Sequence, residues 1–142
     1  MASLSCIPKF VKDEITTAWK NESLKLMLLK NTFTPNAATH QYVSNLDTAT
    51  YEIAATTGYA AGGVAIAGNA STAHGNNYFL DATDQVIGPG ASLNYRYLVV
   101  YADTGNPATS KIRAIIDLET DQIVSNGTST ITWNALGIIY VS

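Results

Sequence analysis

The stretch "LNYRYLVVYAD", residues 93–103, places large side chains on both of its faces if the chain is extended there. Successive side chains of a strand point to opposite sides, which gives an aliphatic face with Leu98 and Val100. The opposite face, called the tyrosine face below, holds Tyr95, Tyr97, Val99 and Tyr101. We expect the aliphatic face to line a core. The tyrosine face is expected to reach solvent or a neighbouring subunit, because a phenol buries its ring and keeps its hydroxyl wet.

Short apolar runs on either side of this stretch predict further strands. In "SLKLMLLK", Leu24, Leu26 and Leu28 share one face, which predicts a strand buried well on one side and partly on the other. The other runs are "YEIAA" from Tyr51, "GGVAIAG", "NNYFLD", "KIRAIIDLE", "STITWN" and "LGIIYV". Turn residues, rather than helical segments, separate these runs. This arrangement predicts an all-β fold, an antiparallel β-sandwich of jelly-roll type.

The N-terminal part of the chain follows a different period. Val11, Ile15 and Trp19 recur every four residues with Phe10 beside them, which predicts one short amphipathic helix after Pro8. We therefore divide the chain into an N-terminal segment, 1–22, and a β-sandwich domain, 23–142. The apolar stripe either anchors the protein to a neighbour, with Trp19 as the strongest contact, or caps the open end of its own sandwich.

A glycine-rich stretch, "TGYAAGGVAIAG" at residues 57–68, raises the question of a phosphate-binding loop. Such a loop needs a Lys and a Ser or Thr directly after its last glycine, at the start of a helix. Here Gly62 and Gly63 precede Val64 and an apolar alternation typical of a strand. The stretch therefore predicts a turn or bulge with Val64 and Ile66 buried, and no nucleotide cofactor.

Other candidate chemistry is sparse. His40 and His74 lie in polar, loop-like surroundings, and no G-x-S-x-G motif accompanies them, although a small hydrolase that uses either histidine stays formally open. Asp117, Glu119 and Asp121 alternate, which suits a calcium site or solubilising charges at the end of a strand; we expect the latter. The sequence thus predicts no catalytic, cofactor-binding or metal-binding residues.

Composition limits the classes of partner. Only 13% of the 142 residues are charged, against roughly 25% in an average soluble domain. The net charge is -3 and no basic patch is present, so nucleic-acid binding is not expected. Cys6 is the single cysteine and excludes an internal disulfide. Because no secretory leader and no long apolar run is seen, we expect synthesis in a cytoplasm and no membrane contact.

Four stretches together resemble one protein family. They are "FTPNAATHQYVSNL", "TGYAAGGVAI", "YRYLVVYADTGNPATS" and "ITWNALGII". In this order and spacing they are similar to small virion structural proteins of tailed bacteriophages. The resemblance implies a non-enzymatic β-sandwich that assembles into the virion after synthesis in the bacterial host cytoplasm. It implies a capsid decoration (cement) protein, or else a tail or head-fibre component.

The same resemblance implies partners. Such proteins commonly form trimers or other homo-oligomers and contact the major capsid protein or another virion protein. A chain poor in charge suits this role, because a neutral polar surface is desolvated without stranding charges. The alternative from another class is a carbohydrate-binding β-module, which would use exposed aromatic residues such as Trp133, Tyr59 and Tyr78 as stacking platforms.

Overall fold

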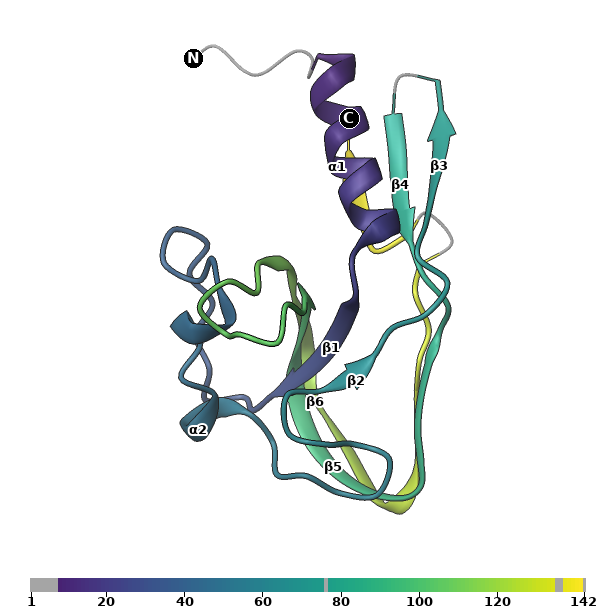
Figure 1. Ribbon diagram of the computed structural model, residues 1–142. Helices are drawn as coiled ribbons and strands as arrows, with labels where there is room; N and C mark the ends of the chain where they lie inside the picture. Colours follow the sequence, from purple (N-terminus) through teal and green to yellow (C-terminus); the bar gives the residue numbers. More distant parts are fainter. Residues whose placement is uncertain (1–7, 76, 135–136, 142) are drawn as a thin grey trace.

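The computed structural model describes residues 8–75, 77–134 and 137–141, so Cys6 lies outside the described residues. Within them, one helix, α1 (Lys9–Asn21), precedes two antiparallel sheets (Figure 1). The larger sheet has the order β2-β1-β5-β6 and the smaller β3-β4-β7. The strands are β1 (Leu24–Leu29), β2 (Val64–Ala65), β3 (Ala70–His74), β4 (Asn77–Asp81), β5 (Gln85–Ala102), β6 (Ile112–Ile131) and β7 (Ile139–Val141). The predicted all-β, sandwich-like fold with a short N-terminal helix is confirmed.

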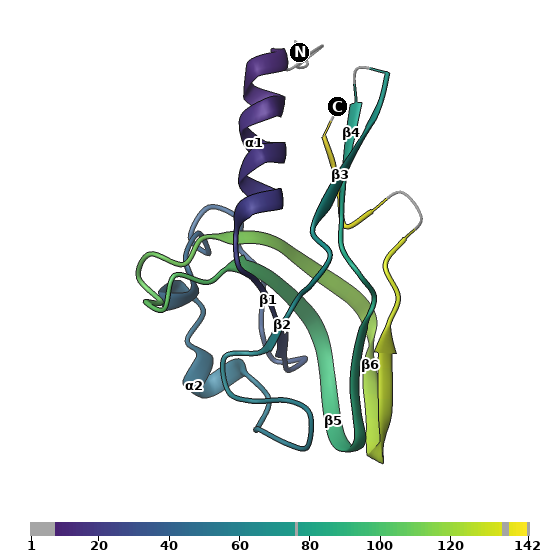
Figure 2. The same ribbon diagram turned by 45° about the vertical axis from the view of Figure 1, so that its right-hand side comes forward.

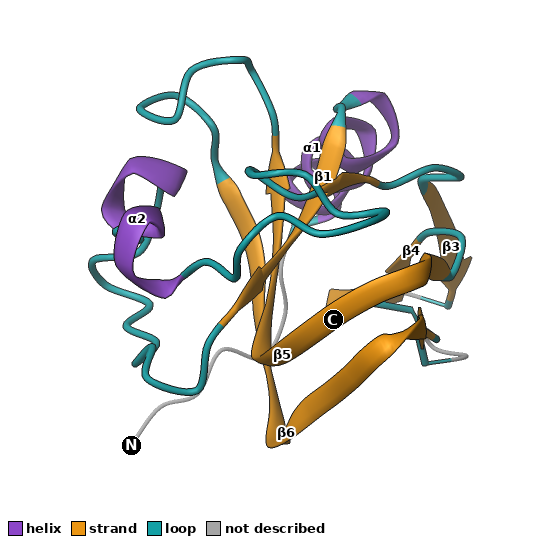
Figure 3. Cartoon of the chain, turned by 90° about the horizontal axis from the view of Figure 1, so that it is seen from below, coloured by secondary structure: helices purple, strands orange, loops and turns teal. Residues whose placement is uncertain are grey.

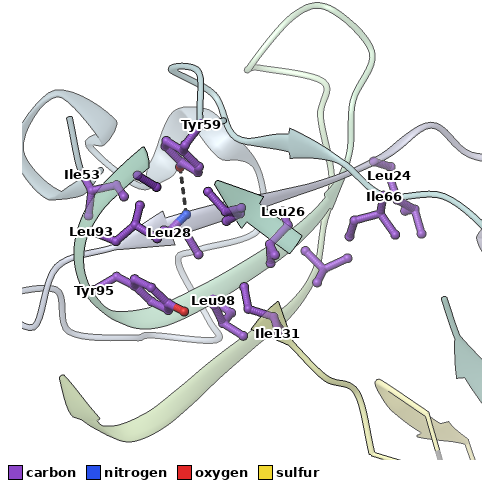
Figure 4. Close-up of a cluster of buried hydrophobic side chains, with 14 of the residues drawn as sticks. Leu24, Leu26, Leu28, Ile53, Tyr59, Ile66, Leu93, Tyr95, Leu98 and Ile131 are labelled. Atoms are coloured by element: carbon purple, nitrogen blue, oxygen red, sulfur yellow. Dashed lines mark hydrogen bonds between the residues drawn. The ribbon is translucent and has the colours of Figure 1, made fainter. Parts of the chain in front are cut away.

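The centre of the larger sheet is the pair β1–β5, which is buried on both faces. Leu26 lies opposite Val100, and Leu28 lies opposite Leu98. On one side these residues form the first core, shown in Figure 4, together with Tyr59 and other buried side chains. On the other side, Met27, Leu29, Tyr97 and Val99 belong to a second core. The burial predicted for Leu24–Leu29, deep on one side and partial on the other, is exceeded, because both of its faces are buried.

Two connecting segments cover these two faces. The first core is closed by the segment 53–66, which contributes Ile53, Tyr59 and Ile66. The second is closed by the segment 33–51, which carries Phe33 and two short helices, η1 (Val43–Asn45) and α2 (Thr48–Tyr51). Figure 3 shows the part that contains α2 lying to one side of β1 and β5. The long polar connection thus forms a layer of the structure.

The strands β5 and β6 form one long, curved hairpin (Figure 2). The runs "KIRAIIDLE" and "STITWN", predicted as two strands, are parts of the single strand β6. Between the pairs Tyr97–Asp117 and Tyr95–Gln122, the four residues 118–121 of β6 face one residue of β5. Glu119 takes a φ of 67° within this bulge. The acidic run lies inside a strand, and its prediction as a strand end was wrong.

Three other predictions of strand limits also differ from the structure. Of the strand predicted from Tyr51, Tyr51 is the last residue of α2, and Glu52 forms only an isolated antiparallel bridge with Leu29 of β1. The strand β5 begins at Gln85, well before Leu93, since the turn-like glycines of "QVIGPGAS" are accommodated inside it. The strand β3 was not predicted, because "ASTAH" has no large apolar residue to give it a period.

The glycine-rich stretch forms the predicted turn. The Gly63 amide donates to the Ala60 carbonyl at 3.0 Å, and Gly62 and Gly63 have φ of 91° and 100°. Ile66 is buried as predicted, while Val64 is half-buried. A side chain at Gly63 would collide with the backbone carbonyl of Leu26, whereas one at Gly62 would have only the Tyr101 hydroxyl within 4 Å. Gly63 therefore lets this turn lie directly on β1.

We predict that Gly63→Ala destabilises the protein much more than Gly62→Ala. Both substitutions impose a left-handed backbone on a residue with a Cβ, which costs about 1–2 kcal/mol. Gly63→Ala must also push β1 away, which should raise its cost to at least about 3 kcal/mol. Urea unfolding of the two variants measures the difference. Equal losses of unfolding free energy would show that the contact with Leu26 relaxes freely.

Candidate interaction surfaces

Trp19 attaches helix α1 to the rest of the fold. Its side chain is 1% exposed and belongs to the first core, and its Nε1 donates to the Asp81 carbonyl at 2.9 Å. The Asn69 amide donates to the carbonyls of Trp19 and Glu22 at 3.1 and 2.9 Å, and so holds the end of the helix. The expectation that Trp19 is the strongest contact with a partner was therefore wrong: an indole buried in its own core offers no surface to a second protein.

Charged side chains complete this attachment. The guanidinium of Arg113, on β6, forms a paired contact with the Glu22 carboxylate just after α1, with Nε 2.9 Å from Oε2. At the other end of the helix, the Tyr78 hydroxyl donates to Asp13 at 3.3 Å. Because Arg113 belongs to the larger sheet and Tyr78 to the smaller, α1 is held against both.

The other residues of the predicted apolar stripe are not fully buried by this packing. Phe10 is 65% exposed and Ile15 is 40% exposed, while Val11 is half-buried. Phe10 lies beside a shallow, open groove along α1 that Glu14 and Thr17 also line. The helix is thus firmly seated through Trp19 while it presents Phe10 and Ile15 to solvent.

A deeper pocket of about 250 Å³ lies where α1 meets the two sheets. We call it the helix pocket. The side chains that line it are Ile15 and Trp19 of α1, Leu80 of β4, Ile139 of β7, and Ile112 and Arg113 of β6. Its wall is apolar except for Arg113, and that guanidinium already binds Glu22. No sequence pattern predicted this pocket, because its residues come from four separate elements.

The tyrosine face is buried within the chain, which corrects the expectation that it reaches solvent or a neighbouring subunit. The Tyr97 ring packs edge-on against Phe33 at 5.5 Å between ring centres. The Tyr101 hydroxyl donates to the Gly62 carbonyl, and burial raises its pKa to about 12. Tyr95 lies in the first core, since the bulge opposite Arg96 breaks the alternation with Tyr97.

A second buried phenol secures the cover of the first core. The Tyr59 hydroxyl accepts from the Leu28 amide and donates to the Glu52 carboxylate, both at 2.9 Å. Glu52 also accepts from the Gly62 amide at 2.7 Å. Burial raises the pKa of Tyr59 above its ordinary value, so the phenol stays protonated and keeps both bonds. These polar groups serve to hold the segment 53–66 on β1.

The aromatic residues considered for carbohydrate stacking are not free platforms. Tyr59 is buried, Tyr78 is half-buried beneath α1, and Trp133 is half-buried with its Nε1 donating to the Thr83 carbonyl at 3.1 Å. A pair that the sequence did not single out combines an exposed tyrosine with a half-buried phenylalanine, Phe79. Tyr140, 54% exposed, stacks on Phe79 at 5.1 Å between ring centres. Because β4 and β7 pair these residues directly, the rings share one face of the smaller sheet.

His40 has a structural role in the loop that follows Pro35. The Nδ1 of His40 accepts from the Asn36 amide at 3.0 Å, and its ring stacks on Phe33. This pair of contacts closes the turn that begins after Pro35. His74 is the last residue of β3 and lies far from His40 in the chain. A hydrolytic site thus gains no support from the position of His40.

The carboxylates considered for calcium are separately occupied. Asp117 binds the Arg96 guanidinium through two hydrogen bonds of 2.8 and 2.9 Å, which lower the pKa of Asp117. Asp121 accepts from the Asn31 side-chain amide at 2.9 Å. Among the described residues, no group of three or more His, Cys, Asp or Glu side chains is arranged to hold a metal ion.

Comparison with family models, with curated proteins and with solved structures finds no match for this chain. No helix in the described part of the chain is both long and apolar enough to cross a membrane. The candidate surfaces are therefore identified from geometry alone. They are the face of α1 that carries Phe10, the helix pocket, and the exposed Tyr140 with its stacked neighbour Phe79.

We predict that Trp19→Ala destabilises the protein by about 3–5 kcal/mol, the usual cost of emptying a buried tryptophan site. Trp19→Phe should cost less than Trp19→Ala because it keeps most of the apolar area, although it leaves the Asp81 carbonyl without its donor. Phe10→Ala, on the exposed face of the same helix, is the control and should change unfolding free energy by about 0.5 kcal/mol or less. A stable Trp19→Ala variant in thermal and urea unfolding would contradict the proposed anchoring.

A pH dependence follows from Asp103, at the end of β5. Its carboxylate accepts from the Gly105 amide at 3.0 Å and binds Lys25 at 3.0 Å, and these contacts lower its pKa below the ordinary value of 3.8. A carboxyl group with a lowered folded-state pKa contributes stability that is present above its unfolded pKa. That stability is lost as the pH falls through the folded pKa.

Asp103→Asn should therefore lower unfolding free energy at neutral pH and should flatten its decline in acid. Urea titrations of the variant and the unsubstituted chain between neutral pH and about pH 2 measure both effects. The two curves should converge at the acid end, where the carboxyl group is protonated in both states. Parallel curves would mean that Asp103 contributes nothing through its ionisation.

Proposed function

We propose that this chain is a non-enzymatic structural protein of a tailed-phage virion, a decoration (cement) protein that binds the major capsid protein and stabilises the head. The proposal starts from the resemblance of the stretches at 33–46, 57–66, 95–110 and 131–139 to small virion proteins. In the fold, the first two of these stretches cover the two cores, and the third forms much of β5. The resemblance thus concerns residues that build the scaffold.

The observation that carries the proposal is the exposed Tyr140 ring stacked on the half-buried Phe79. Tyrosine and phenylalanine are enriched in protein interfaces, and a ring that is already ordered by stacking loses little conformational freedom on binding. The pair lies on a three-stranded sheet that α1 supports from its other side, where Tyr78 contacts Asp13. A low overall charge of the chain, 13% of residues, limits the desolvation cost around such a contact.

Two polar side chains first considered for chemistry, those of His40 and Asp117, favour a structural role, and so does the buried contact of Glu52. His40 closes a turn, Asp117 binds Arg96, and Glu52 holds the segment over the first core. Each of these groups is engaged in keeping the fold together. A protein whose polar groups are used in this way is suited to passive assembly on a particle.

The number of copies per virion tests the proposed location. Quantitative mass spectrometry of purified virions that carry the protein should give hundreds of copies, as expected for a protein spread over the head. A handful of copies would overturn the decoration role and favour the tail or head-fibre alternative.

Binding to purified heads that lack the protein tests the surface. Tyr140→Ser should weaken binding roughly tenfold or more, because it removes a large apolar contact. Ile123→Ser is the matched control, since Ile123 is 70% exposed on the distant part of β6. Unchanged binding by Tyr140→Ser, with the control also unchanged, would exclude this surface as the contact with the head.

A further inference from the structure

A second pocket, of about 420 Å³, lies beside the second core. We call it the loop pocket, because the loop 103–110, which connects β5 to β6, forms one of its walls. Its lining combines apolar with charged side chains, which include Met27, Val43 and Pro107 on the apolar part and Lys25, Glu52 and Asp103 on the charged part. Apolar walls with a few polar groups, in a pocket of about 300–1,000 Å³, are typical of sites for small ligands.

The wall that the loop forms is fixed before any ligand arrives. The Val43 amide donates to the Ser110 carbonyl at 3.0 Å. The Ser44 amide donates to the Pro107 carbonyl, also at 3.0 Å, so the loop is bound to the cover of the second core. Figure 1 shows this loop, in green, beside the segment that carries η1 and α2. A site that is already ordered loses little conformational freedom when it binds a ligand.

Two carboxylates converge in the loop pocket. Burial raises the pKa of Tyr101 to about 12, and the charges of Asp103 and Glu52 add to that rise, so both carboxylates lie near the same phenol. Asp103 is neutralised by Lys25, whose Nζ lies 3.0 Å from Oδ2 of Asp103. Glu52 has no ion pair among the described residues. The lining thus has an unneutralised negative charge at Glu52.

Glu52 offers one carboxylate oxygen to a ligand. Its Oε1 accepts both hydrogen bonds that hold the side chain, from the Tyr59 hydroxyl at 2.9 Å and from the Gly62 amide at 2.7 Å. Within the described part of the chain, no donor is bound to the other oxygen, Oε2. A cation at Oε2 therefore leaves the attachment of the first cover intact.

These features favour a cation on an aliphatic stem. An ammonium or guanidinium group forms charge-assisted hydrogen bonds to a carboxylate, and these are about twice as strong as neutral ones. An anion would be repelled by Glu52 and Asp103, and a wholly apolar ligand would take water from the Glu52 charge without replacing it. Methylene groups suit the apolar lining, and there is room for several, because a cavity of about 150 Å³ already accepts benzene.

We propose that the loop pocket binds an ammonium or guanidinium group carried on an aliphatic stem, with Glu52 as its counter-ion. Lys25, which is bound to Asp103, repels the ligand's cation from that carboxylate and so directs it to Glu52. Two sources offer this chemistry, a basic side chain of a partner protein and a free alkylamine. The site uses neither Phe79 nor Tyr140, and it does not depend on attachment to a virion.

NMR titration of the full, isotope-labelled chain gives the first test. The cationic probes are acetyl-lysine amide and acetyl-arginine amide. The matched uncharged probe is acetyl-norleucine amide, which has the lysine stem without its ammonium group. The Gly62 amide, which is bound to Glu52, should shift saturably with both cationic probes. The norleucine probe should bind roughly tenfold more weakly or not at all.

Two results of this titration would overturn the proposal. One is equal binding of the norleucine and lysine probes, which would mean that the pocket recognises only the stem. The other is a Gly62 amide that shows no saturable shift with either cationic probe. n-Butylamine then distinguishes the sources of a bound cation. Binding as tight as that of acetyl-lysine amide supports a free amine, and weaker binding supports a side chain within a polypeptide.

Substitution of Glu52 locates the cation. Glu52→Gln keeps a carbonyl acceptor for Tyr59 and Gly62 and removes the charge, so it should weaken binding of acetyl-arginine amide roughly tenfold or more. Glu119→Gln is the matched control, because Glu119 is an exposed acid outside the pocket lining. It should leave binding unchanged. Circular dichroism checks that both variants keep the fold, and a folded Glu52→Gln chain with undiminished binding would contradict the assignment of the counter-ion.

Lys25→Met provides an independent measurement in which binding should improve. It removes the competing ammonium group and frees Asp103, so acetyl-arginine amide should bind roughly threefold tighter or more. The substitution does not touch the hydrogen bonds of Glu52, so it tests the pocket even if Glu52→Gln fails to fold. Weaker or unchanged binding by Lys25→Met would show that the charge of the lining does not select the ligand, and the proposal would fail.

Discussion

The burial of the β1–β5 pair on both faces is the constraint on which the rest of this structure depends. The two strands pair along six residues, from Leu24–Ala102 to Leu29–Tyr97, and the side chains on both sides are apolar for most of that length. Backbone groups in such a strand pair mostly satisfy one another, and the Leu28 amide donates to the buried Tyr59 hydroxyl instead. The consequence is that two covers are required, one for each face.

Much of the chain between the strands serves as these two covers. Hydrogen bonds of Tyr59 to Leu28 and Glu52 attach one cover to β1, and the aromatic contacts of Phe33 with Tyr97 and His40 consolidate the other. Both faces of the β1–β5 pair are occupied internally, and the exposed large apolar side chains of the described residues lie on α1, on the β5–β6 hairpin and on β7. The helix pocket and the pair Phe79–Tyr140 belong to α1 and the strands packed beside it. Figure 1 shows α1 beside β3 and β4 at one end of the molecule.

Sequence patterns predicted the regular, strongly apolar elements well. The helix after Pro8 and the strands at Leu24 and Tyr78 have clear periods, and the glycines before Val64 lack the residues of a phosphate loop. Predictions of strand limits failed where a strand continues through a local irregularity. The bulge at residues 118–121 makes β6 one strand, and it moves Tyr95 to the opposite core from Tyr97. No local pattern distinguishes such a bulge from the end of a strand.

Interaction surfaces were harder to predict than the fold. An apolar stripe on α1 was evident from spacing alone, yet its most prominent member, Trp19, is buried while Phe10 remains exposed. The difference arises because residues distant in the chain hold Trp19: the Asp81 carbonyl accepts from the indole, Leu80 shares its core, and Asn69 donates to the Trp19 backbone carbonyl. Spacing alone does not distinguish a stripe that packs on its own fold from one that faces a partner.

The pattern of residues was therefore sufficient to establish an all-β chain with one short helix and strands that are apolar on two sides. Periodicity carries that information, because it reflects the geometry of each element. It does not say which segment will cover a given apolar face. Packing placed Tyr97, Val99 and Tyr101 under the segment 33–51, and it left Phe10, Tyr140 and the helix pocket open. That choice depends on contacts between residues far apart in the chain, which no local period records.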